Sequence, residues 1–307
     1  FEAEFAKYHS RKYGLMTPNC TQALHLLLEG LNIKDGDEVI VPDCTWIGSV
    51  AGITYQRAKT VFADIHPINW CICPKSVEKL ITDKTKAIII NSPNNPTGAV
   101  YRPAEIEQLV MLANKYDLWI IDDMIYATLV WADYGYTSPT TFPGGKERTL
   151  TIGGWSKGWA MTGWRLGWIG GSTEVANAVK KINASAATHV PTFLMPAAIT
   201  ALSLEQETRI MANSFKERCE VIYRLLDALP GISVPKPEGA FYALCDITGT
   251  GMSDIEFANR ALEEAKVQLI PGSLMEGGEG FVRISYATSM ENIDEGVKRL
   301  SNWLNSL

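Results

Sequence analysis

Short, almost wholly apolar segments alternate with stretches of helical periodicity along the first half of the chain. The strands predicted from these segments cover 37–42, 60–65, 86–90, 118–126 and 149–153. Residues 1–15 are predicted to form a helix and a link, and further helices are predicted at 19–31, 66–84 and 103–115. Strands this apolar are typical of sheets covered on both faces, and they alternate with helices. We therefore expect a mostly parallel sheet with right-handed crossovers.

The last third of the chain begins with a long helical stretch from residue 191 toward residue 229. Strands are then predicted at 240–245 and 279–287, and helices at 254–266 and 292–304. Because 307 residues suffice for two domains, we predict an α/β fold with a large domain at 1–212 and a smaller α+β domain at 213–307. The chain starts without a methionine inside an amphipathic pattern, so we expect the natural N-terminus of the large domain to be missing.

Three polar side chains follow three of the predicted strands directly. Asn95 comes after the strand at 86–90, Asp123 lies at the end of the next strand, and Lys157 follows the strand at 149–153. The carboxyl ends of parallel strands meet at one edge of a sheet, where ligands bind in such folds. The sequence therefore predicts that these three residues converge on one site.

Lys157 lies in an unusually aromatic stretch, GGWSKGWAMTGWRLGW, which also contains Arg165. Apolar surroundings disfavour an ammonium, so they lower the pKa of a lysine and make its amine a better nucleophile. Such an amine can form a Schiff base with an aldehyde. The alternative is a lysine whose stem lies along apolar surface while its charge reaches water.

Composition excludes several classes of protein. Apolar residues make up 46% of the chain and charged residues 20%, as in ordinary globular proteins. The net charge is −6 and basic residues form no block, which argues against nucleic acid or an anionic membrane as the main partner. No apolar run approaches the roughly 20 residues of a membrane-spanning helix.

The cysteines and histidines give no sign of a metal site. Six cysteines are scattered along the chain: Cys20, Cys44, Cys71, Cys73, Cys219 and Cys245. In a chain of this size they suit free thiols in a reducing compartment, so we expect a cytoplasmic protein. Cys71 and Cys73 form a lone pair without a second pair at ligand spacing, and the four histidines do not cluster, so no metal is expected.

The lysine stretch resembles the signature of class I/II aminotransferases, enzymes of fold type I that use pyridoxal 5'-phosphate (PLP). Their pattern of serine, lysine, several residues and then glycine-x-arginine-x-glycine is matched here by SKGWAMTGWRLG. The resemblance implies that Lys157 carries PLP as a Schiff base and that Ser156 and Arg165 contact the cofactor, Arg165 through its phosphate. Gly154 stands where some members have a phosphate-binding serine.

Two further strings resemble the same family. In NNPTG, the resemblance places the Asn95 amide on the 3'-oxygen of the cofactor and beside the substrate, and the Asn95–Pro96 bond is a candidate for the cis form. The family pattern Asp-x-x-Tyr aligns with Asp123 and Tyr126, which implies that Asp123 pairs with the pyridine nitrogen and Tyr126 bonds the 3'-oxygen. For Asp122 we expect a helix cap or a solvated acid. The alternative for the NNPTG string is a plain turn that ends a strand.

Near the N-terminus, Asn19-Cys20-Thr21 opens a predicted helix, and the amide groups of Cys20 and Thr21 at a helix start suit a phosphate. Asn19 stands where the family usually has glycine, and asparagine tolerates a positive φ; the alternative is a plain N-cap. Trp46 fills the family position of an aromatic ring that stacks on PLP, unless it is a core tryptophan.

The predicted strand EGFVRISYA carries a single arginine, Arg283. A buried guanidinium needs an anion. The equivalent arginine of the family binds the substrate α-carboxylate in a two-pronged pair, and the alternative is an internal salt bridge.

These resemblances imply an aminotransferase that moves an amino group between an amino acid and a 2-oxo acid and that forms a homodimer with active sites at the interface. Another PLP reaction, β-elimination or decarboxylation, stays open because the same residues serve it. The first 65 residues also resemble the DegT-like sugar aminotransferases of the same fold, so a nucleotide-sugar substrate stays open too. A PLP-binding sensor without enzymatic activity is the third alternative. The aromatic run at 126–136 favours an apolar or aromatic amino acid.

Overall fold

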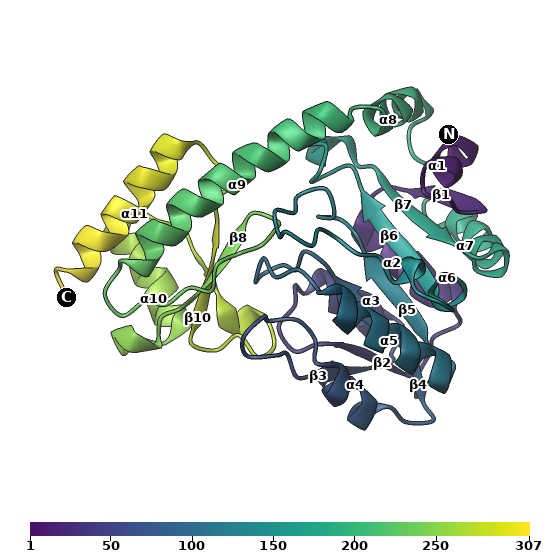
Figure 1. Ribbon diagram of the computed structural model, residues 1–307, viewed down its shortest axis with the longest axis horizontal. Coiled ribbons are helices and arrows are strands. Elements are labelled where there is room, and N and C mark those ends of the chain that lie inside the picture. The colour runs from purple at the N-terminus through teal and green to yellow at the C-terminus, as the bar shows by residue number, and fades with distance from the viewer.

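A computed structural model describes residues 1–307 as two β-sheets joined by a long helix (Figure 1). The larger sheet has the strand order β1-β7-β6-β5-β4-β2-β3. Its strands are β1 (Tyr13–Thr17), β2 (Glu38–Pro42), β3 (Lys59–Ala63), β4 (Thr85–Asn91), β5 (Trp119–Asp123), β6 (Thr149–Gly154) and β7 (Gly167–Gly171). The neighbours from β3 through β6 pair in parallel, and β7 pairs antiparallel with both β6 and β1. The predicted mostly parallel sheet is therefore confirmed.

Helices cover both faces of this sheet, which explains why its strands are so apolar. The helices of this part are α1 (Glu2–Tyr8), α2 (Cys20–Gly30), α3 (Gly48–Tyr55), α4 (Pro74–Leu80), α5 (Pro103–Tyr116), α6 (Gly145–Arg148) and α7 (Thr173–Ala186). Side chains alternate along β4: Ile89 packs in a core with α2 and α7, whereas Ile88 and Ile90 pack in a second core with α4 and α5. Both cores hold the carboxyl ends of the strands in register.

The smaller sheet is antiparallel, with the order β8 (Tyr242–Asp246), β10 (Phe281–Ser285) and β9 (Ile270–Pro271). It packs with α10 (Asp254–Arg260) and α11 (Met290–Leu304). The helix α9 (Glu205–Asp227) runs along one side of the molecule from the larger sheet to the smaller one (Figure 1). The predicted helical stretch from 191 is interrupted, because α8 (Met195–Leu202) ends before α9 begins.

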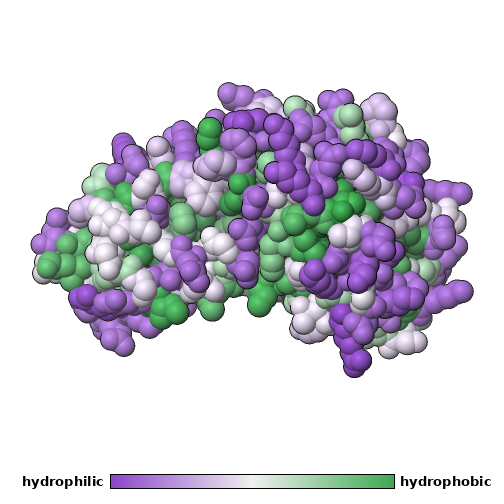
Figure 2. All heavy atoms as spheres, turned by 90° about the horizontal axis from the view of Figure 1, so that it is seen from below, coloured by the Kyte–Doolittle hydropathy of each residue, from purple (hydrophilic) through white to green (hydrophobic).

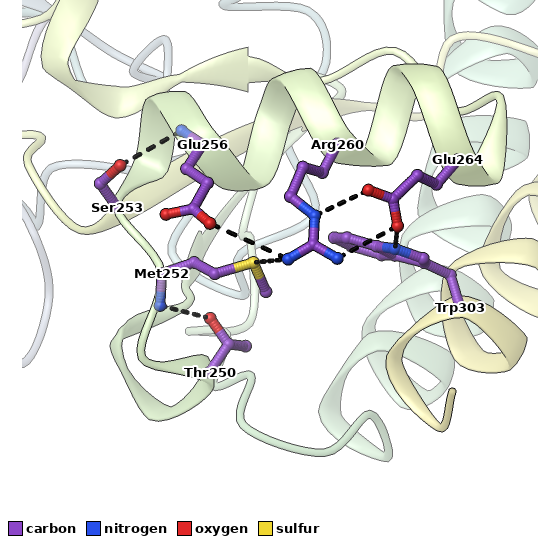
Figure 3. Close-up of polar contacts among 7 residues, drawn as sticks. All are labelled: Thr250, Met252, Ser253, Glu256, Arg260, Glu264 and Trp303. Carbon is purple, nitrogen blue, oxygen red and sulfur yellow. Dashed lines mark hydrogen bonds and ion pairs between the residues drawn. The ribbon is translucent and has the colours of Figure 1, made fainter. Parts of the chain in front are cut away.

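One cluster joins α10 to α11 at the end of the chain (Figure 3). The Arg260 guanidinium lies 5.8 Å from the Trp303 ring centre, and its Nε donates to Glu264 Oε1 at 2.7 Å. Trp303 Nε1 donates to the other oxygen of Glu264 at 2.7 Å. Directly after Arg260, the end of α10, the chain forms a single π-helical turn, Ala261–Ala265, which includes Glu264. These contacts join α10 and the π-helical turn to α11, and both helices pack on the smaller sheet.

Several elements were not predicted. Residues 1–15 were expected to form a helix and a link, yet residues 13–17 form β1, an edge strand beside β7. The strand β7 is rich in glycine and has no strand pattern of its own. The predicted helix at 66–84 is shorter, because the bridge between Ile65 and Ile72 precedes Pro74, which starts α4. Tertiary pairing thus outweighs local propensity at these places.

The surface is mixed in character. Seen from below, hydrophilic residues cover most of the face, and hydrophobic ones gather near its middle (Figure 2). None of the helices combines the length and the apolar character that crossing a membrane requires. All six cysteines are free thiols, as predicted.

Candidate active site

A cavity of about 270 Å³ lies at the carboxyl edge of the parallel strands. It collects residues that follow β4, β5 and β6, the first turn of α2 and one arginine of β10. The predicted site residues that line it are Cys20, Thr21, Trp46, Asn95, Asp123, Tyr126, Ser156, Lys157, Arg165 and Arg283. The predicted convergence of three strand ends is therefore confirmed, and the structure brings all ten residues to one place.

Lys157 lies three residues past the end of β6, and it lines the cavity at this edge of the sheet. Its Nζ lies 5.5 Å from the centre of the Phe241 ring. Burial lowers the pKa of Lys157, and the positive charges of Arg283 and Arg165 lower it further. A larger share of this amine is therefore neutral than for a lysine in water.

The tryptophans beside Lys157 in sequence do not line the cavity. Trp155 is fully buried in a separate core, where its Nε1 donates to the Ala198 carbonyl at 3.2 Å. Trp159 Nε1 donates to the Ala201 carbonyl at 2.7 Å. The lowered pKa was predicted, but the ring next to the amine is Phe241, which no local pattern around Lys157 indicates.

Asp123 ends β5 and accepts two hydrogen bonds on one oxygen. Its Oδ1 accepts from Cys20 Sγ at 3.3 Å and from the Ile125 amide at 3.1 Å. Burial raises the pKa of Asp123 to about 6, and these hydrogen bonds oppose the shift. No lysine, arginine or histidine forms an ion pair with this carboxylate. The site therefore lacks a positive partner for it within this chain.

Asp122 is not a helix cap or a solvated acid, so that prediction was wrong. Consecutive strand residues point to opposite faces, and Asp122 points away from the cavity into fully buried surroundings. Its Oδ2 accepts from Tyr136 Oη at 2.5 Å and from Ser138 Oγ at 3.0 Å. Burial raises its pKa to about 7.

Asn95 is held on both sides. Its Oδ1 accepts from Arg283 Nη1 at 2.9 Å, and its backbone N–H donates to Asn91 Oδ1 at 3.0 Å. Asn91 in turn donates to the Asp123 carbonyl at 3.2 Å. Because the oxygen of the Asn95 amide is occupied, the amide nitrogen is left for an acceptor. The Asn95–Pro96 bond is cis, as expected, and so is Ser92–Pro93.

The start of α2 is capped by Asn19. Its side chain accepts from the Gln22 amide at 2.8 Å, and its φ of −172° is extended. The plain N-cap is therefore confirmed, and the positive φ that was considered for Asn19 is absent. Cys20 and Thr21 occupy the first turn, where backbone N–H groups have no partner within the helix. Arg165 faces the same cavity from a left-handed residue, φ 55°.

Arg283 lies close to two aromatic rings. Its guanidinium carbon lies 4.6 Å from the Trp46 ring centre and 4.7 Å from that of Tyr242. Its Nε is buried and has no hydrogen-bond partner. Since Asn95 occupies Nη1, the edge formed by Nε and Nη2 is left for an anion. The internal salt bridge considered as an alternative does not form.

Tyr242 was not predicted as a site residue, yet it lines the cavity. Its hydroxyl lies 3.0 Å from the hydroxyl of Tyr126. The available signal was weak: alternation along the strand at 240–245 places Tyr242 on one face, but nothing local indicates what that face meets.

Known proteins resemble this chain in sequence and in fold. The family described as "Aminotransferase class I and II" matches residues 1–300. The chain belongs to this family. The aspartate aminotransferase of Thermotoga maritima is 39% identical over 297 residues, which span 95% of this chain and 75% of that protein. The aromatic-amino-acid aminotransferase 2 of Thermococcus litoralis is 35% identical over 277 residues, 89% of this chain and 71% of that protein.

Solved structures agree with the sequence comparison. The crystal structure of the Thermotoga maritima aspartate aminotransferase has a TM-score of 0.91 and 36% identity, with 99% of this aminotransferase and 80% of that chain covered. The aromatic aminotransferase from Pyrococcus horikoshii also has a TM-score of 0.91, at 33% identity, with 95% and 79% covered. The predicted fold type I is therefore confirmed, and the aminotransferase depends on PLP, the cofactor of its family.

The family match starts at residue 1. It therefore includes the first 65 residues, which were expected to resemble the DegT-like sugar branch. These comparisons give that second resemblance no support. The short string around Trp46 thus belongs to the class I and II framework of this aminotransferase.

Proposed function

We propose that this aminotransferase moves an amino group between an amino acid and a 2-oxo acid, with the α-carboxylate of each bound by Arg283. The observation that carries the proposal is the unpaired edge of the Arg283 guanidinium at the cavity. The Nε on this edge is buried and has no hydrogen-bond partner within the chain. A buried donor on a cation is costly unless a ligand satisfies it. A carboxylate matches that edge with two parallel hydrogen bonds.

The chemistry of the cavity suits PLP. The residues that would hold the cofactor are Lys157 at its aldehyde carbon, Asp123 at its ring nitrogen, Asn95 and Tyr126 at its 3'-oxygen, and Trp46 at its ring. Its phosphate would meet the backbone amides of Cys20 and Thr21 and the side chains of Ser156 and Arg165. When bound, PLP supplies an electron sink for the carbon that carries the amino group. The fit rests on Asp123, whose carboxylate has no cation in this chain, and on the Asn95 amide nitrogen, which is left for an acceptor.

Asp123 would keep a proton on the ring nitrogen. A carboxylate beside a cation has a lowered pKa, which offsets the rise that burial causes. The hydrogen bonds from Cys20 and from the Ile125 amide stabilise the ionised form and aim its other oxygen into the cavity. The result is a fixed negative charge at the end of β5.

Lys157 would act as the acid and base of the reaction. Burial and the two arginines lower its pKa toward neutral pH, and an amine with such a pKa can both accept and return a proton. Nζ would take the proton from the substrate α-carbon and later return it. Arg283 and Arg165 support this role, because both destabilise the ammonium form.

Arg283 and Lys157 bear on some of the alternatives but not on all of them. β-Elimination or decarboxylation of an amino acid would use the same residues, and only the products separate these reactions from transamination. A nucleotide sugar has no α-carboxylate, so the open edge of Arg283 favours an amino acid over a sugar. A sensor without activity would not need the amine of Lys157 to have a lowered pKa.

We also propose a homodimer with active sites at the interface, a large domain at 1–212 and a small domain at 213–307. Large apolar side chains at the cavity and next to it support the dimer, since Trp46, Ile47 and Trp164 are exposed in the single chain. The boundary would lie within α9, which connects the two sheets. Six free thiols support a reducing compartment such as the cytoplasm.

The test is the visible spectrum of the purified protein with PLP, recorded with single amino acids and without an oxo acid. A yellow band that one amino acid bleaches, in wild type but not in Lys157→Ala, would support transamination and would name the donor. Consumption of the amino acid while the band persists would point to elimination or decarboxylation. Absence of a band in the wild type would refute the proposal.

A further inference from the structure

We propose that Tyr242 is a positioning residue of this active site, whose ring orients the Arg283 guanidinium and whose hydroxyl fixes the hydroxyl of Tyr126. The proposal rests on the proposed function, because it assumes that Arg283 binds the substrate carboxylate. Tyr242 belongs to no motif of the sequence analysis. Its side chain contacts both Arg283 and Tyr126.

The pairing of β8 with β10 brings Tyr242 to Arg283. Arg283 lies directly opposite Leu244, and Tyr242 lies two residues from Leu244 on the same face. Diagonal neighbours on one face of an antiparallel pair are within reach of aromatic and long side chains. The ring of Tyr242 therefore meets the guanidinium as a direct result of strand register.

The ring contact restricts a long side chain. Trp46 and Tyr242 flank the guanidinium at 4.6 and 4.7 Å, while Asn95 holds Nη1. An arginine loses much rotamer freedom when it binds a ligand, and the contacts with two rings and with Asn95 remove part of that freedom beforehand. The Nε and Nη2 edge is thus already oriented when the carboxylate arrives.

The hydroxyl contact acts on the other side of the cavity. Tyr242 Oη and Tyr126 Oη are 3.0 Å apart, and both side chains are buried. Burial raises the pKa of each, so both keep their protons. In such a pair one hydroxyl donates to the other. When Tyr242 donates, the proton of Tyr126 is left for a ligand in the cavity.

The backbone before Tyr242 is attached to the loop that carries Tyr126. The Ala240 amide donates to the Leu129 carbonyl at 2.9 Å, and Gly239 forms a bridge with Val130. Trp131 Nε1 donates to the Pro237 carbonyl at 2.9 Å. Tyr242 therefore sits where the smaller sheet is joined to the larger one, and its two contacts connect β10 with the end of β5.

The two contacts can be tested separately. Tyr242→Phe keeps the ring and removes the hydroxyl, whereas Tyr242→Met removes both and keeps an apolar side chain of similar length. We expect Tyr242→Phe to leave the KM for the donor within twofold of wild type and to shift the pH titration of the cofactor band by at least 0.3 pH units. Tyr242→Met should raise the KM about tenfold and leave the Kd for PLP, measured by titrating stripped protein, within threefold.

Tyr116→Phe is the control, since it removes a hydroxyl contact with Glu78 at the surface. It should match wild type in all three measurements. Thermal melts would show whether each variant is folded. If both folded Tyr242 variants kept the wild-type KM and band titration, the proposal would be overturned. If Tyr242→Met failed to fold, the band titration of Tyr242→Phe would still decide the hydroxyl role.

Arg283→Leu separates this proposal from the proposed function. A high KM in Arg283→Leu with a normal KM in Tyr242→Met would refute the role of Tyr242 alone. A normal KM in Arg283→Leu would refute the carboxylate site itself, and with it the basis of the present proposal.

Discussion

Cys20 Sγ donates a hydrogen bond to Asp123 Oδ1 over 3.3 Å, although the two residues lie 103 positions apart in the chain. Burial, followed by the charge of Asp123, raises the pKa of Cys20 well above its usual value, so the thiol remains protonated. Cys20 therefore acts as a donor and not as a nucleophile. One residue thus links the first turn of α2 to the carboxylate at the end of β5.

Cys20→Ala should weaken PLP binding. The loss of one hydrogen bond from a weak donor predicts a Kd about two- to fivefold higher, measured by titrating stripped protein with PLP. Cys20→Ser restores a donor and should stay closer to wild type. Cys73→Ala is the matched control, because this free cysteine does not line the cavity. An unchanged Kd in Cys20→Ala would show that the thiol does not support Asp123.

Arg283→Leu should raise the KM for the amino-acid donor at least about 30-fold, since it removes a charged, two-pronged contact. Arg283→Lys keeps the charge but not the two-pronged geometry, so its KM should lie between that of the wild type and that of Arg283→Leu. Arg299→Leu removes an arginine that contacts Glu295 at 2.8 Å on the surface, and steady-state kinetics should not change. Equal KM values for wild type and Arg283→Leu would contradict the assignment.

Asp122→Asn should change how stability depends on pH. The pKa of Asp122 is about 7 in the folded protein and 3.8 as its ordinary value. Between these values the folded state keeps a proton that the unfolded state loses, so rising pH destabilises the wild type. From pH 5 to about pH 7 this group accounts for a loss on the order of 3 kcal/mol. In Asp122→Asn the free energy of unfolding should lack this part of the decline with pH.

The measurement is urea unfolding at pH 5 and pH 8, with the exposed Asp35→Asn as the control. Wild type and Asp35→Asn should show the same fall in the free energy of unfolding between the two values, and Asp122→Asn a smaller one. A fall of equal size in Asp122→Asn would mean that this carboxyl ionises normally in the folded protein.

Gly158→Ala should disturb the turn that carries Lys157. A Cβ at residue 158 would lie 2.0 Å from Thr128 Oγ1, a hydroxyl that is buried without a partner. Overpacking of this kind costs about 1–3 kcal/mol, which a thermal melt would detect. The double variant with Thr128→Ala should recover at least half of the loss. Failure of that rescue would place the clash elsewhere.

The parts of the site that follow strands were predictable from the sequence. Asn95, Asp123 and Lys157 each come directly after an apolar run, and parallel topology alone brings such residues to one edge. The capped start of α2 beside the cavity was predictable because residues before and within the first turn of a helix have a known pattern. These predictions depend on local order along the chain.

Contacts that depend on strand register or on the packing of distant segments were not predictable. Tyr242 meets Arg283 only through the register of β8 with β10, and its hydroxyl meets Tyr126 only because the sheets pack together. The error at Asp122 has the same origin. Its strand position was clear, but nothing local shows that Tyr136 and Ser138 cover that face. Strand β7 was missed because glycine-rich segments carry little pattern.

The separation of roles between the two sheets has a consequence for how such an enzyme diversifies. On the proposed assignments, the groups that retain the cofactor belong to the larger sheet and to α2, whereas Arg283 and Tyr242 belong to the smaller one. Mutations at Arg283 would then change how the shared α-carboxylate is bound, while the groups on the larger sheet that hold the cofactor stay in place. The carboxylate site could therefore be redesigned in β8 and β10 for substrates without an α-carboxylate, separately from the cofactor site in the larger sheet.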